Sequence, residues 1–300
     1  MESCTGFVEW YRLRVLRKTG REPAPSTLRS KRYRVQRAMR AAQVNSCVDL
    51  GTLLTDREAV EQLLDRLALG MTPGALATIV DALRDFGEYA KLQGWCSYVA
   101  LEKADKPGPN PQKPIVVYSK PEMDLLLANA RGFGGLRWWA LLETVAGTGR
   151  RIGEVLGLEW DWLRLSAEPP HFHLPYTKNG RQAYVPLSTH LVEHVFTPEH
   201  MAALKLETVS AFGQPFGRDA QVYVFPWSYQ AVCKRLQRYC EKLGVENRGF
   251  HCFRHTKATE WLARGVPIQA VSALLGHSAV QTTDRVYSHV TALDFARYVS

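Results

Sequence analysis

The spacing of apolar residues predicts a helical bundle in the first hundred residues. Apolar side chains recur every three to four positions, which places them on one face of a helix. The expected helices cover residues 5–18, about 27–42, 56–69 and 73–92. Hydroxyl side chains are expected to cap three of them, namely Ser26 or Thr27, Thr55 and Thr72.

A proline-rich segment separates this bundle from the rest of the chain. Residues 106–114 contain four prolines and one glycine, and proline lacks the N–H and the backbone freedom that a helix or a central strand requires. Such a segment is an extended spacer with a reach of roughly 25–30 Å. We therefore expect a helical domain over residues 1–105, a linker over 106–114 and a second domain over 115–300. The spacer suits a two-domain clamp, and an ordinary interdomain linker has the same composition.

The second domain is predicted to be mainly α with a small antiparallel β-sheet. The expected helices cover residues 119–130, 136–145, 151–158, 229–243, 251–264, 268–275 and 280–290. The expected strands cover residues 162–165, 172–176 and 182–185. Asn179 and Gly180 form a favoured hairpin turn between the last two strands.

Positive charge is concentrated at one end of the chain. The net charge is +9, and the first 40 residues hold eleven Lys or Arg against three Glu, so that segment alone carries +8. A basic stripe is typical of a nucleic-acid contact surface, although a solvated helix face or attraction to anionic lipid gives the same count. The candidate DNA ligands in the second predicted helix are Arg29, Lys31, Arg32, Arg34, Arg37 and Arg40.

The composition narrows the class of protein. A hydrophobic content of 46% and a charged content of 22% are typical of a globular protein. No run reaches the ~18 apolar residues of a membrane span, and the first residues lack the pattern of a secretory signal. We therefore expect a cytoplasmic protein without a membrane partner. The six cysteines form no C-x-x-C pair, which argues against a structural zinc site.

One basic motif stands at the start of a predicted helix. Thr148-Gly-Arg-Arg151 is followed by Glu154. An arginine there can hold a phosphate through two hydrogen bonds, and Glu154 lies on the same helix face, where it can orient the guanidinium. Taken alone, such an arginine more often pairs with a carboxylate.

A second basic motif lies further along the chain. His251, Arg254 and His255 share one face of a predicted helix, so imidazole and guanidinium point the same way. A zinc-protease motif is excluded because position 252 is Cys and supplies no glutamate base. Taken alone, the motif fits a phosphate site and a surface basic cluster equally well.

Four further residues are candidates for the same chemistry. Gly276 ends a predicted helix and places His277 at an exposed corner, and Tyr287 lies on the helix that follows. Lys178 and Arg181 lie at the tip of the predicted hairpin, from which they can reach a DNA groove. A single tyrosine is usually a half-buried packing residue, and a lysine in a turn is usually solvated. These residues therefore indicate a function only together with the other motifs.

Together these motifs resemble the tyrosine recombinase (phage integrase) family over roughly residues 118–290. The matching elements, in family order, are Thr148-Gly-x-Arg151-x-x-Glu154, Lys178, His251-x-x-Arg254-His255, Leu275-Gly-His277 and Tyr287. The resemblance implies a two-domain clamp. Its N-terminal helical bundle would bind a core DNA site, and its α+β catalytic domain would end in a short C-terminal tail.

The resemblance also implies a mechanism in which Tyr287 attacks a backbone phosphate and forms a 3′-phosphotyrosyl intermediate. The implied roles are phosphate binding by Arg151, Arg254 and His277, proton acceptance by His251, and proton donation by Lys178. Glu154 and His255 would support the arginines. The bonds exchanged have similar free energies, so no ATP, metal or other cofactor is implied.

A member of this family would act on double-stranded DNA at attachment or core sites as a homotetramer. Our first hypothesis for its role is integration and excision of a phage or mobile element, with an accessory directionality factor as a further partner. Our second hypothesis is resolution of chromosome or plasmid multimers. Two other functions are alternatives to a recombinase. A type IB topoisomerase shares the chemistry, and a DNA-binding protein whose catalytic site has decayed is the alternative that is not an enzyme. The 105 residues before the linker leave room for one DNA-binding module, so we expect no separate arm-site domain.

Overall fold

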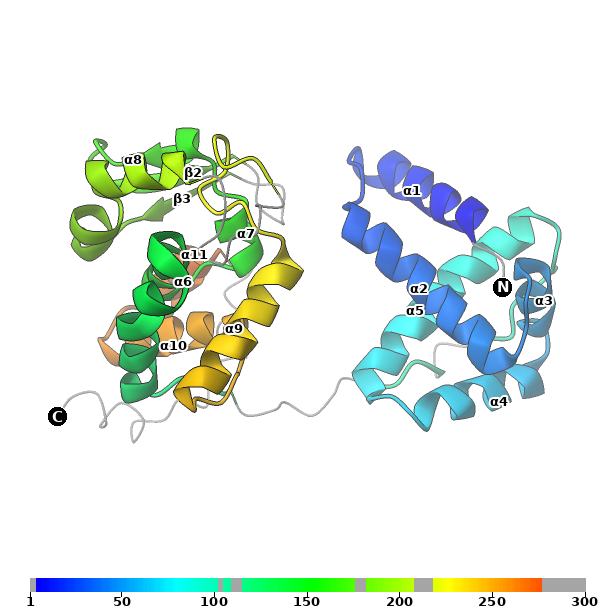
Figure 1. Ribbon diagram of the computed structural model, residues 1–300. Coiled ribbons are helices and arrows are strands. Elements are labelled where there is room, and N and C mark those ends of the chain that lie inside the picture. Colours follow the sequence, from blue (N-terminus) through cyan, green and yellow to red (C-terminus); the bar gives the residue numbers. More distant parts are fainter. Residues whose placement is uncertain (1–3, 102–104, 109–114, 176–181, 208–217, 277–300) are drawn as a thin grey trace. The chain divides into compact units, whose positions relative to one another are not determined.

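The computed structural model describes residues 4–101, 105–108, 115–175, 182–207 and 218–276 (Figure 1). The chain divides into two compact units, an N-terminal unit of residues 1–113 and a C-terminal unit of residues 114–300. No helix in the described ranges combines the length and the hydrophobicity needed to cross a membrane.

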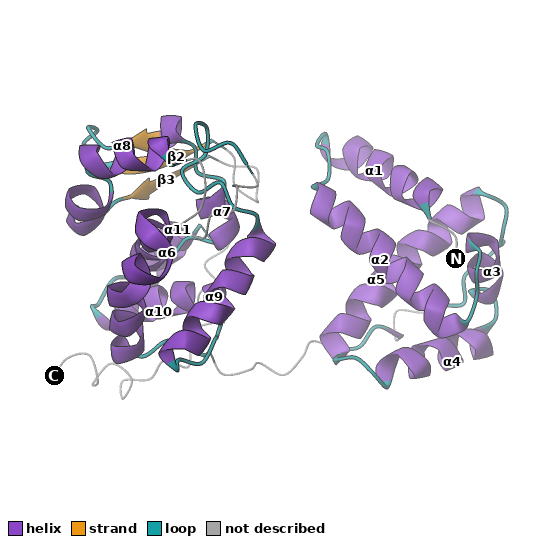
Figure 2. Ribbon diagram, in the orientation of Figure 1, coloured by secondary structure: helices purple, strands orange, loops and turns teal. Residues whose placement is uncertain are grey.

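The N-terminal unit consists of helices in the part of it that the structure describes. They are α1 (Thr5–Thr19), α2 (Pro25–Ala42), α3 (Cys47–Leu53), α4 (Arg57–Ala68) and α5 (Pro73–Leu92). Helix α5 packs against each of the other four (Figure 2). Phe7, Val35, Leu50, Leu63 and Phe86 bring one side chain from each helix into a shared core. Burying an aliphatic or aromatic side chain contributes about 1.5–3 kcal/mol, so this core stabilises the bundle.

The caps of these helices correct two of the expected starts. Helix α2 begins at Pro25, which needs no N–H partner in the first turn, and its N-cap Ala24 makes no side-chain bond. Ser26 and Thr27 therefore lie inside the helix and do not cap it. Helix α4 is capped by Asp56, whose carboxylate accepts from two backbone N–H groups, and the Thr55 hydroxyl instead donates to a carbonyl of the preceding turn.

The starts of two other helices can be compared with the sequence prediction. Thr72 caps α5 as expected, accepting from the N–H of Ala75. Helix α3 was not expected from the pattern, because seven residues are too short to show a clear period. It is capped by Ser46, whose hydroxyl accepts from the N–H of Asp49.

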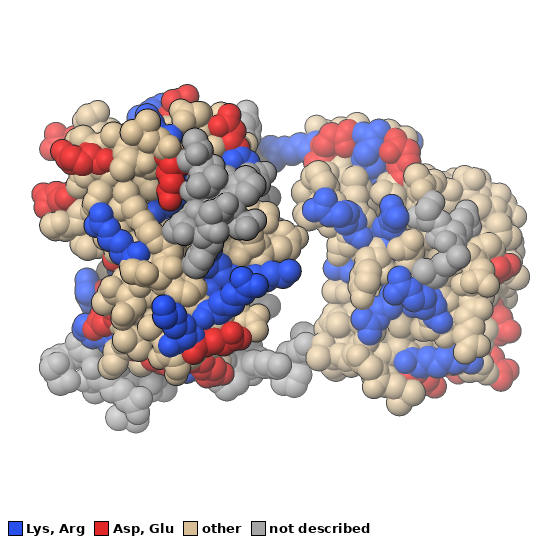
Figure 3. All heavy atoms as spheres, viewed as in Figure 1, with Lys and Arg blue, Asp and Glu red and all other residues tan. Residues whose placement is uncertain are grey.

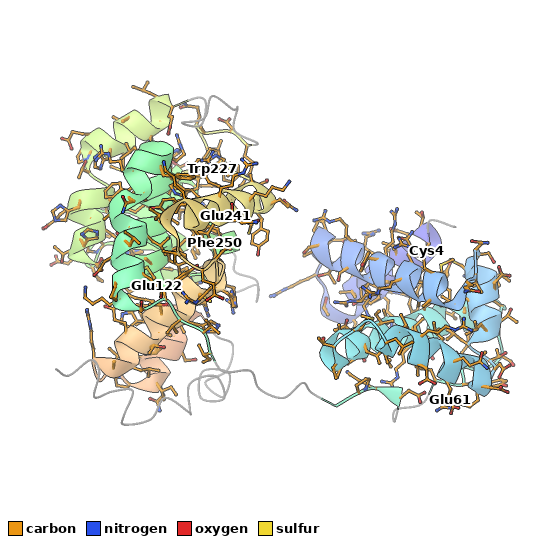
Figure 4. The ribbon with its side chains drawn as sticks, turned by 60° about the horizontal axis from the view of Figure 1, so that its bottom comes forward. Cys4, Glu61, Glu122, Trp227, Glu241 and Phe250 are labelled. Atoms are coloured by element: carbon orange, nitrogen blue, oxygen red, sulfur yellow. The ribbon has the colours of Figure 1, made fainter. Side chains whose placement is uncertain are left out.

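A long helix, α6 (Lys120–Thr148), runs through the core of the C-terminal unit. The sequence predicts two helices here, and the backbone of α6 is interrupted at Gly135, whose φ of 77° and ψ of −174° are not helical. The element therefore consists of two helical segments that meet at a kink, and this φ is open to glycine but strained for other residues. The capping box of Ser119 and Glu122 starts the helix as the sequence indicates. Trp138 of α6 is buried and contacts the rings of Trp227 and Phe250, both labelled in Figure 4.

The sheet of this unit has three antiparallel strands in the order β1-β2-β3 among the described residues. They are β1 (Leu163–Arg164), β2 (His171–Leu174) and β3 (Ala183–Pro186). Phe172 pairs with Leu163 on one side and Val185 on the other. Phe172, Leu174 and Val185 are buried, so one face of the sheet packs on the core. The predicted fold class, mainly α with a small antiparallel sheet, is confirmed.

The remaining helices place the site. They are α7 (Ile152–Leu156), α8 (Pro198–Leu206), α9 (Tyr229–Leu243), α10 (Phe250–Ala263) and α11 (Ile268–Leu275). Helix α8 was not expected. Helix α10 packs against both α6 and α11, and this packing brings the end of α11 to the loop that joins α6 to α7. The helix expected over residues 280–290 and the turn at Asn179 and Gly180 lie outside the described residues.

Candidate active site

The loop between α6 and α7 carries the first basic motif. The hydroxyl of Thr148 donates to the carbonyl of Thr144 at 2.6 Å, and Gly149 then ends α6 with a φ of 61°. After this left-handed residue the next two side chains differ sharply in exposure. The side chain of Arg150 is 3% exposed, whereas that of Arg151 is 28% exposed.

Glu154 joins these two neighbouring arginines. Its Oε2 lies 3.0 Å from Nε of Arg150, and its Oε1 accepts from Nη1 of Arg151 at 3.3 Å. The backbone N–H of Arg151 also donates to Glu154 at 3.3 Å. The Glu154 side chain is only 10% exposed, so water screens these contacts weakly. Burial lowers the pKa of Arg150, and the charge of Glu154 opposes that shift.

The end of α11 is held by three arginines. The last carbonyls of a helix have no partner within it, and positive charge is favoured there. Three consecutive carbonyls each accept from a different guanidinium. The pairs are Arg150 Nη1 with Leu274 O at 3.2 Å, Arg254 Nη1 with Leu275 O at 2.7 Å, and Arg151 Nη1 with Gly276 O at 3.4 Å.

Arg254 is more deeply buried than Arg151, the other predicted phosphate ligand that the structure describes. It projects from α10, is 3% exposed, and also donates from Nη1 to the carbonyl of Gly149 at 3.1 Å. It thereby ties the α6–α7 loop to the end of α11. The structure brings Arg151 and Arg254 to the same turn of chain, as the predicted site requires.

A pocket of about 430 Å³ opens beside Arg151. Its polar lining comes from Arg151, Glu154 and His251, and its apolar lining includes Ile152, Trp162, Leu174 and Tyr229. Arg151 and His251 are a hundred residues apart in sequence, Arg151 just before α7 and His251 in α10, yet both line this pocket. Arg254 does not line it.

His251 and His255 occupy successive turns of α10. Their ring centroids are 5.5 Å apart, with the rings nearly perpendicular. His251 is exposed. Burial lowers the pKa of His255, and the charges of His251 and Arg254 add to this shift, so that the pKa falls to about 4. His255 is therefore neutral at pH 7.

Four predicted site residues lie outside the described residues. They are Lys178, Arg181, His277 and Tyr287. Gly276, the last described residue, directly precedes His277 in the chain. Among the residues that the structure describes, no cluster of three or more His, Cys, Asp or Glu side chains is arranged to hold a metal ion.

The candidate DNA ligands of α2 do not share one environment. Arg29, Arg32 and Arg40 are exposed, and Arg34 and Arg37 are partly exposed. Figure 3 shows basic side chains along α2 on the face turned to the viewer.

Lys31 differs from its neighbours on α2, and its burial corrects its prediction as a DNA ligand. It is 8% exposed, forms an ion pair with Asp85 of α5, and lies 4.9 Å from the ring centre of Tyr11. Position 31 falls on the buried face of α2, beside Val35 and Ala38. Its charge is neutralised inside the bundle, so we remove Lys31 from the candidate DNA ligands.

Sequence analysis missed two residues that line the pocket and one buried residue beside it. Trp162 and Tyr229 line the pocket, and Arg150 lies beneath the turn at 274–276. The two aromatic residues sit at the edges of predicted elements without any distinguishing pattern. Arg150 stands at the variable position of Thr-Gly-x-Arg, where nothing in the sequence marks it as buried.

Comparisons with known proteins identify a family and a fold. The model of the phage integrase family matches residues 118–293. The tyrosine recombinase XerD of Lacticaseibacillus casei is 28% identical over 225 residues, which cover 73% of each chain. A lambda integrase dimer bound to a COC′ core site has a TM-score of 0.65 at 14% identity, covering 92% of this chain and 96% of that one. XerH bound to its difH substrate has a TM-score of 0.59 at 18% identity, covering 82% of this chain and 70% of that one.

Proposed function

The chain belongs to the phage integrase family of tyrosine recombinases, and from that membership we propose that it cuts and rejoins DNA strands at specific sites. The observation that carries the proposal is the pocket shared by Arg151 and His251, with Arg254 bound to the same turn of chain. The cut strand would be held through a 3′-phosphotyrosyl bond to Tyr287.

The proposed site suits the charge that develops during strand cleavage. Attack on a phosphodiester spreads additional negative charge over the phosphate oxygens, and preorganised donors stabilise it most effectively. Arg151 reaches the pocket while its guanidinium is already oriented by Glu154 and Gly276. We propose that Arg151, Arg254 and His277 bind the phosphate.

The proton transfers complete the proposed step. A phenol has a pKa near 10 and is mostly protonated at pH 7, so the attacking oxygen needs an acceptor. His251 is exposed and lines the pocket, and we assign it that role. As Oη of Tyr287 bonds to phosphorus, the bond to the 5′ oxygen breaks, and that oxygen takes a proton from Lys178. Rejoining is the reverse step with a new 5′ hydroxyl.

The N-terminal unit is the proposed core-site-binding domain. Residues 1–105 would bind the duplex, residues 106–114 would link the domains, and residues 115–300 would carry the catalytic site and tail. The exposed arginines of α2 suit contacts with phosphates, which position a protein on DNA. The likeness to lambda integrase and XerH, whose structures hold DNA, supports a double-stranded DNA partner. A homotetramer would be needed to exchange strands between two duplexes.

Two biological roles fit this activity. Integration and excision of a phage or mobile element, with an accessory directionality factor, is the first. Resolution of chromosome or plasmid multimers is the second, and the XerD relatives favour it. A plasmid assay separates them. Joining of two unlike sites on separate circles supports integration, whereas reaction only between identical sites on one circle supports resolution.

The nucleophile is tested by trapping the covalent adduct. Nicked duplexes from fragmented genomic DNA of the source strain would be incubated with the protein, and SDS-stable adducts sequenced to identify the site. Trypsin then assigns the tyrosine, because Tyr287 lies in peptide 286–297, Tyr298 in 298–300 and Tyr229 in 219–234. We expect the nucleotide mass on peptide 286–297.

Substitutions give an independent answer. Tyr287→Phe should bind the selected duplex and form no adduct, whereas Tyr298→Phe should form it as the unchanged chain does. Tyr229 is the competing assignment, since its side chain lines the pocket. Adduct formation by Tyr287→Phe, with loss in Tyr229→Phe, would move the nucleophile to Tyr229 and refute the proposed site.

A further inference from the structure

Arg150 is a buried arginine next to the site that the proposed mechanism does not use. Its residue exposure is 2%, and it is absent from the lining of the pocket. It occupies the variable position of the Thr-Gly-x-Arg motif, so the motif assigns it no role. A guanidinium is costly to bury unless its charge and its donors are matched. Its partners therefore indicate what it does.

Both groups that orient Arg151 are themselves in contact with Arg150. The first is Glu154, which accepts from Arg151 through Oε1 and lies against Nε of Arg150 through Oε2 at 3.0 Å. A carboxylate held at both oxygens has little freedom to rotate.

The second group is the turn at residues 274–276, whose last carbonyl accepts from Arg151. Nη1 of Arg150 donates to Leu274 O, two residues earlier. The guanidinium also lies directly against Gly276, since a Cβ built on that glycine would come within 2.5 Å of Nη1 and 3.0 Å of Nη2. Arg150 thus sets how closely the turn approaches the α6–α7 loop.

Arg254 depends on the same turn. Its Nη1 donates to Leu275 O, which lies between the carbonyl bound by Arg150 and the one bound by Arg151. A displacement of the turn would therefore move the partners of both proposed phosphate ligands together. His277 follows the turn directly in the chain.

We propose that Arg150 is a positioning residue that fixes Arg151 and Arg254 relative to each other, through Glu154 and the carbonyls of residues 274–276. It does not touch the phosphate. Its extended guanidinium matters because Nε lies 3.0 Å from the carboxylate of Glu154 while Nη1 donates to the carbonyl of Leu274, a division that one ammonium group cannot reproduce. This inference rests on the proposed function of Arg151 and Arg254.

The chain offers a matched control for the loss of a buried arginine. Arg137 of α6 is fully buried, its Nε lies 2.9 Å from Oε2 of Glu207, and its Nη1 donates to Val224 O at 2.5 Å. It has the same kinds of partner as Arg150, but none of them belongs to the site. Arg137→Met should lower the melting temperature without slowing cleavage in the folded protein.

The test compares Arg150→Met, Arg150→Lys and Arg137→Met on the selected nicked duplex, at a temperature where circular dichroism shows all three folded. We expect Arg150→Met to bind DNA within about twofold of the unchanged chain. At saturating DNA, its adduct should form roughly 10- to 100-fold more slowly than with Arg137→Met, the scale for displaced reacting groups. Arg150→Lys should remain slow.

Each outcome has a distinct meaning. Equal adduct rates for Arg150→Met and Arg137→Met would overturn the positioning role, and full recovery in Arg150→Lys would show that charge alone suffices, which also overturns it. Arg151→Ala separates this inference from the proposed function. If Arg151→Ala forms adduct at the normal rate, the proposed site itself is wrong. If Arg151→Ala is slow while Arg150→Met is not, only the inference about Arg150 fails.

Discussion

The arginines of α2 and the arginines at the end of α11 differ in what holds them in place. On α2, Arg29, Arg32 and Arg40 are exposed, and no ion pair within the described ranges involves them. At the end of α11, Arg150, Arg151 and Arg254 each donate to a backbone carbonyl of one turn. The first set has conformational freedom, whereas the second set is oriented before any ligand arrives.

From this difference we expect the two sets to have different roles, with α2 contributing to DNA binding and the end of α11 to cleavage. Exposed charges attract the DNA backbone over a distance, and the attraction falls as salt screens it. Donors that are already oriented need no reorganisation when charge develops on a phosphate, which is what stabilises a transition state. We therefore expect substitutions on α2 to change binding and its salt dependence, and substitutions at the end of α11 to change the rate of cleavage.

The largest expected effect is on the rate of adduct formation after loss of a proposed phosphate ligand. Arg151→Ala should slow adduct formation by at least about 10²-fold, the scale for removing one preorganised donor. Affinity for the selected duplex should stay close to normal. Single-turnover adduct formation at saturating DNA measures the first quantity and fluorescence anisotropy the second. If Arg151→Ala lost DNA affinity by the same factor as rate, Arg151 would act in binding, as the α2 arginines are expected to, and the contrast between the two sets would be wrong.

Arg254→Ala should slow the same step by a similar factor and also destabilise the protein. Arg254 is buried, and its removal leaves the carbonyls of Gly149 and Leu275 without this donor, at a cost of about 1–3 kcal/mol for each unsatisfied group. Urea unfolding should show the loss of stability, and Arg151→Ala should show much less. Equal stabilities for the two variants would contradict the buried position of Arg254.

A smaller effect on the rate is expected at Gly276. Its φ of 69° strains any other residue, and an added Cβ would press on the guanidinium of Arg150. Gly244 is a matched control, since its φ is 68° with nothing within 4 Å of the added Cβ. Both alanine variants should lose about 1 kcal/mol of stability. Only Gly276→Ala should also slow adduct formation, by roughly tenfold. Equal rates for the two variants would show that the turn tolerates displacement.

Sequence pattern predicted the long elements well, and the reasons are local. Helices α9 and α11 begin and end where expected, because Gly244 and Gly276 each end a helix in the left-handed conformation. Helices α3 and α8 are short and show too few periods to be recognised. The family motif predicted one site for Arg151, His251 and Arg254. In the structure Arg151 and His251 line one pocket, and Arg254 donates to the turn that Arg151 also contacts.

The exposure of individual charged residues could not be read from the sequence. Arg150 and Arg151 are identical neighbours, and only the turn at Gly149 directs one inward and the other to the pocket. Lys31 stands among the arginines of α2, and its partner Asp85 is 54 residues away. Both cases depend on tertiary contacts that no local pattern records. The number of basic residues therefore predicted a basic surface on α2 but wrongly included Lys31 in it.

The salt dependence of DNA binding tests whether the exposed arginines of α2 contact phosphates. The variant Arg29→Ala/Arg32→Ala/Arg40→Ala should weaken binding and reduce the slope of log K against log salt by about 2–3, because each phosphate that the protein no longer neutralises lowers the slope by about 0.9. Its cleavage rate at saturating DNA should be normal. Lys31→Ala is the control within the same helix, because its ion pair with Asp85 lies inside the bundle. It should lower stability and leave the slope unchanged.

The smallest effect expected is a pH dependence confined to the C-terminal unit. Burial, together with the charges of His251 and Arg254, lowers the pKa of His255 to about 4 in the folded chain, whereas an unfolded histidine titrates near 6.5. Between these values the unfolded chain binds the proton more readily, so stability is complete above pH 6.5 and falls as the pH drops toward 4. The N-terminal unit contains no histidine. His255→Gln should therefore flatten the fall in melting temperature between pH 6.5 and 4.5, and an unchanged slope would show that His255 is protonated as easily in the folded cluster as in water.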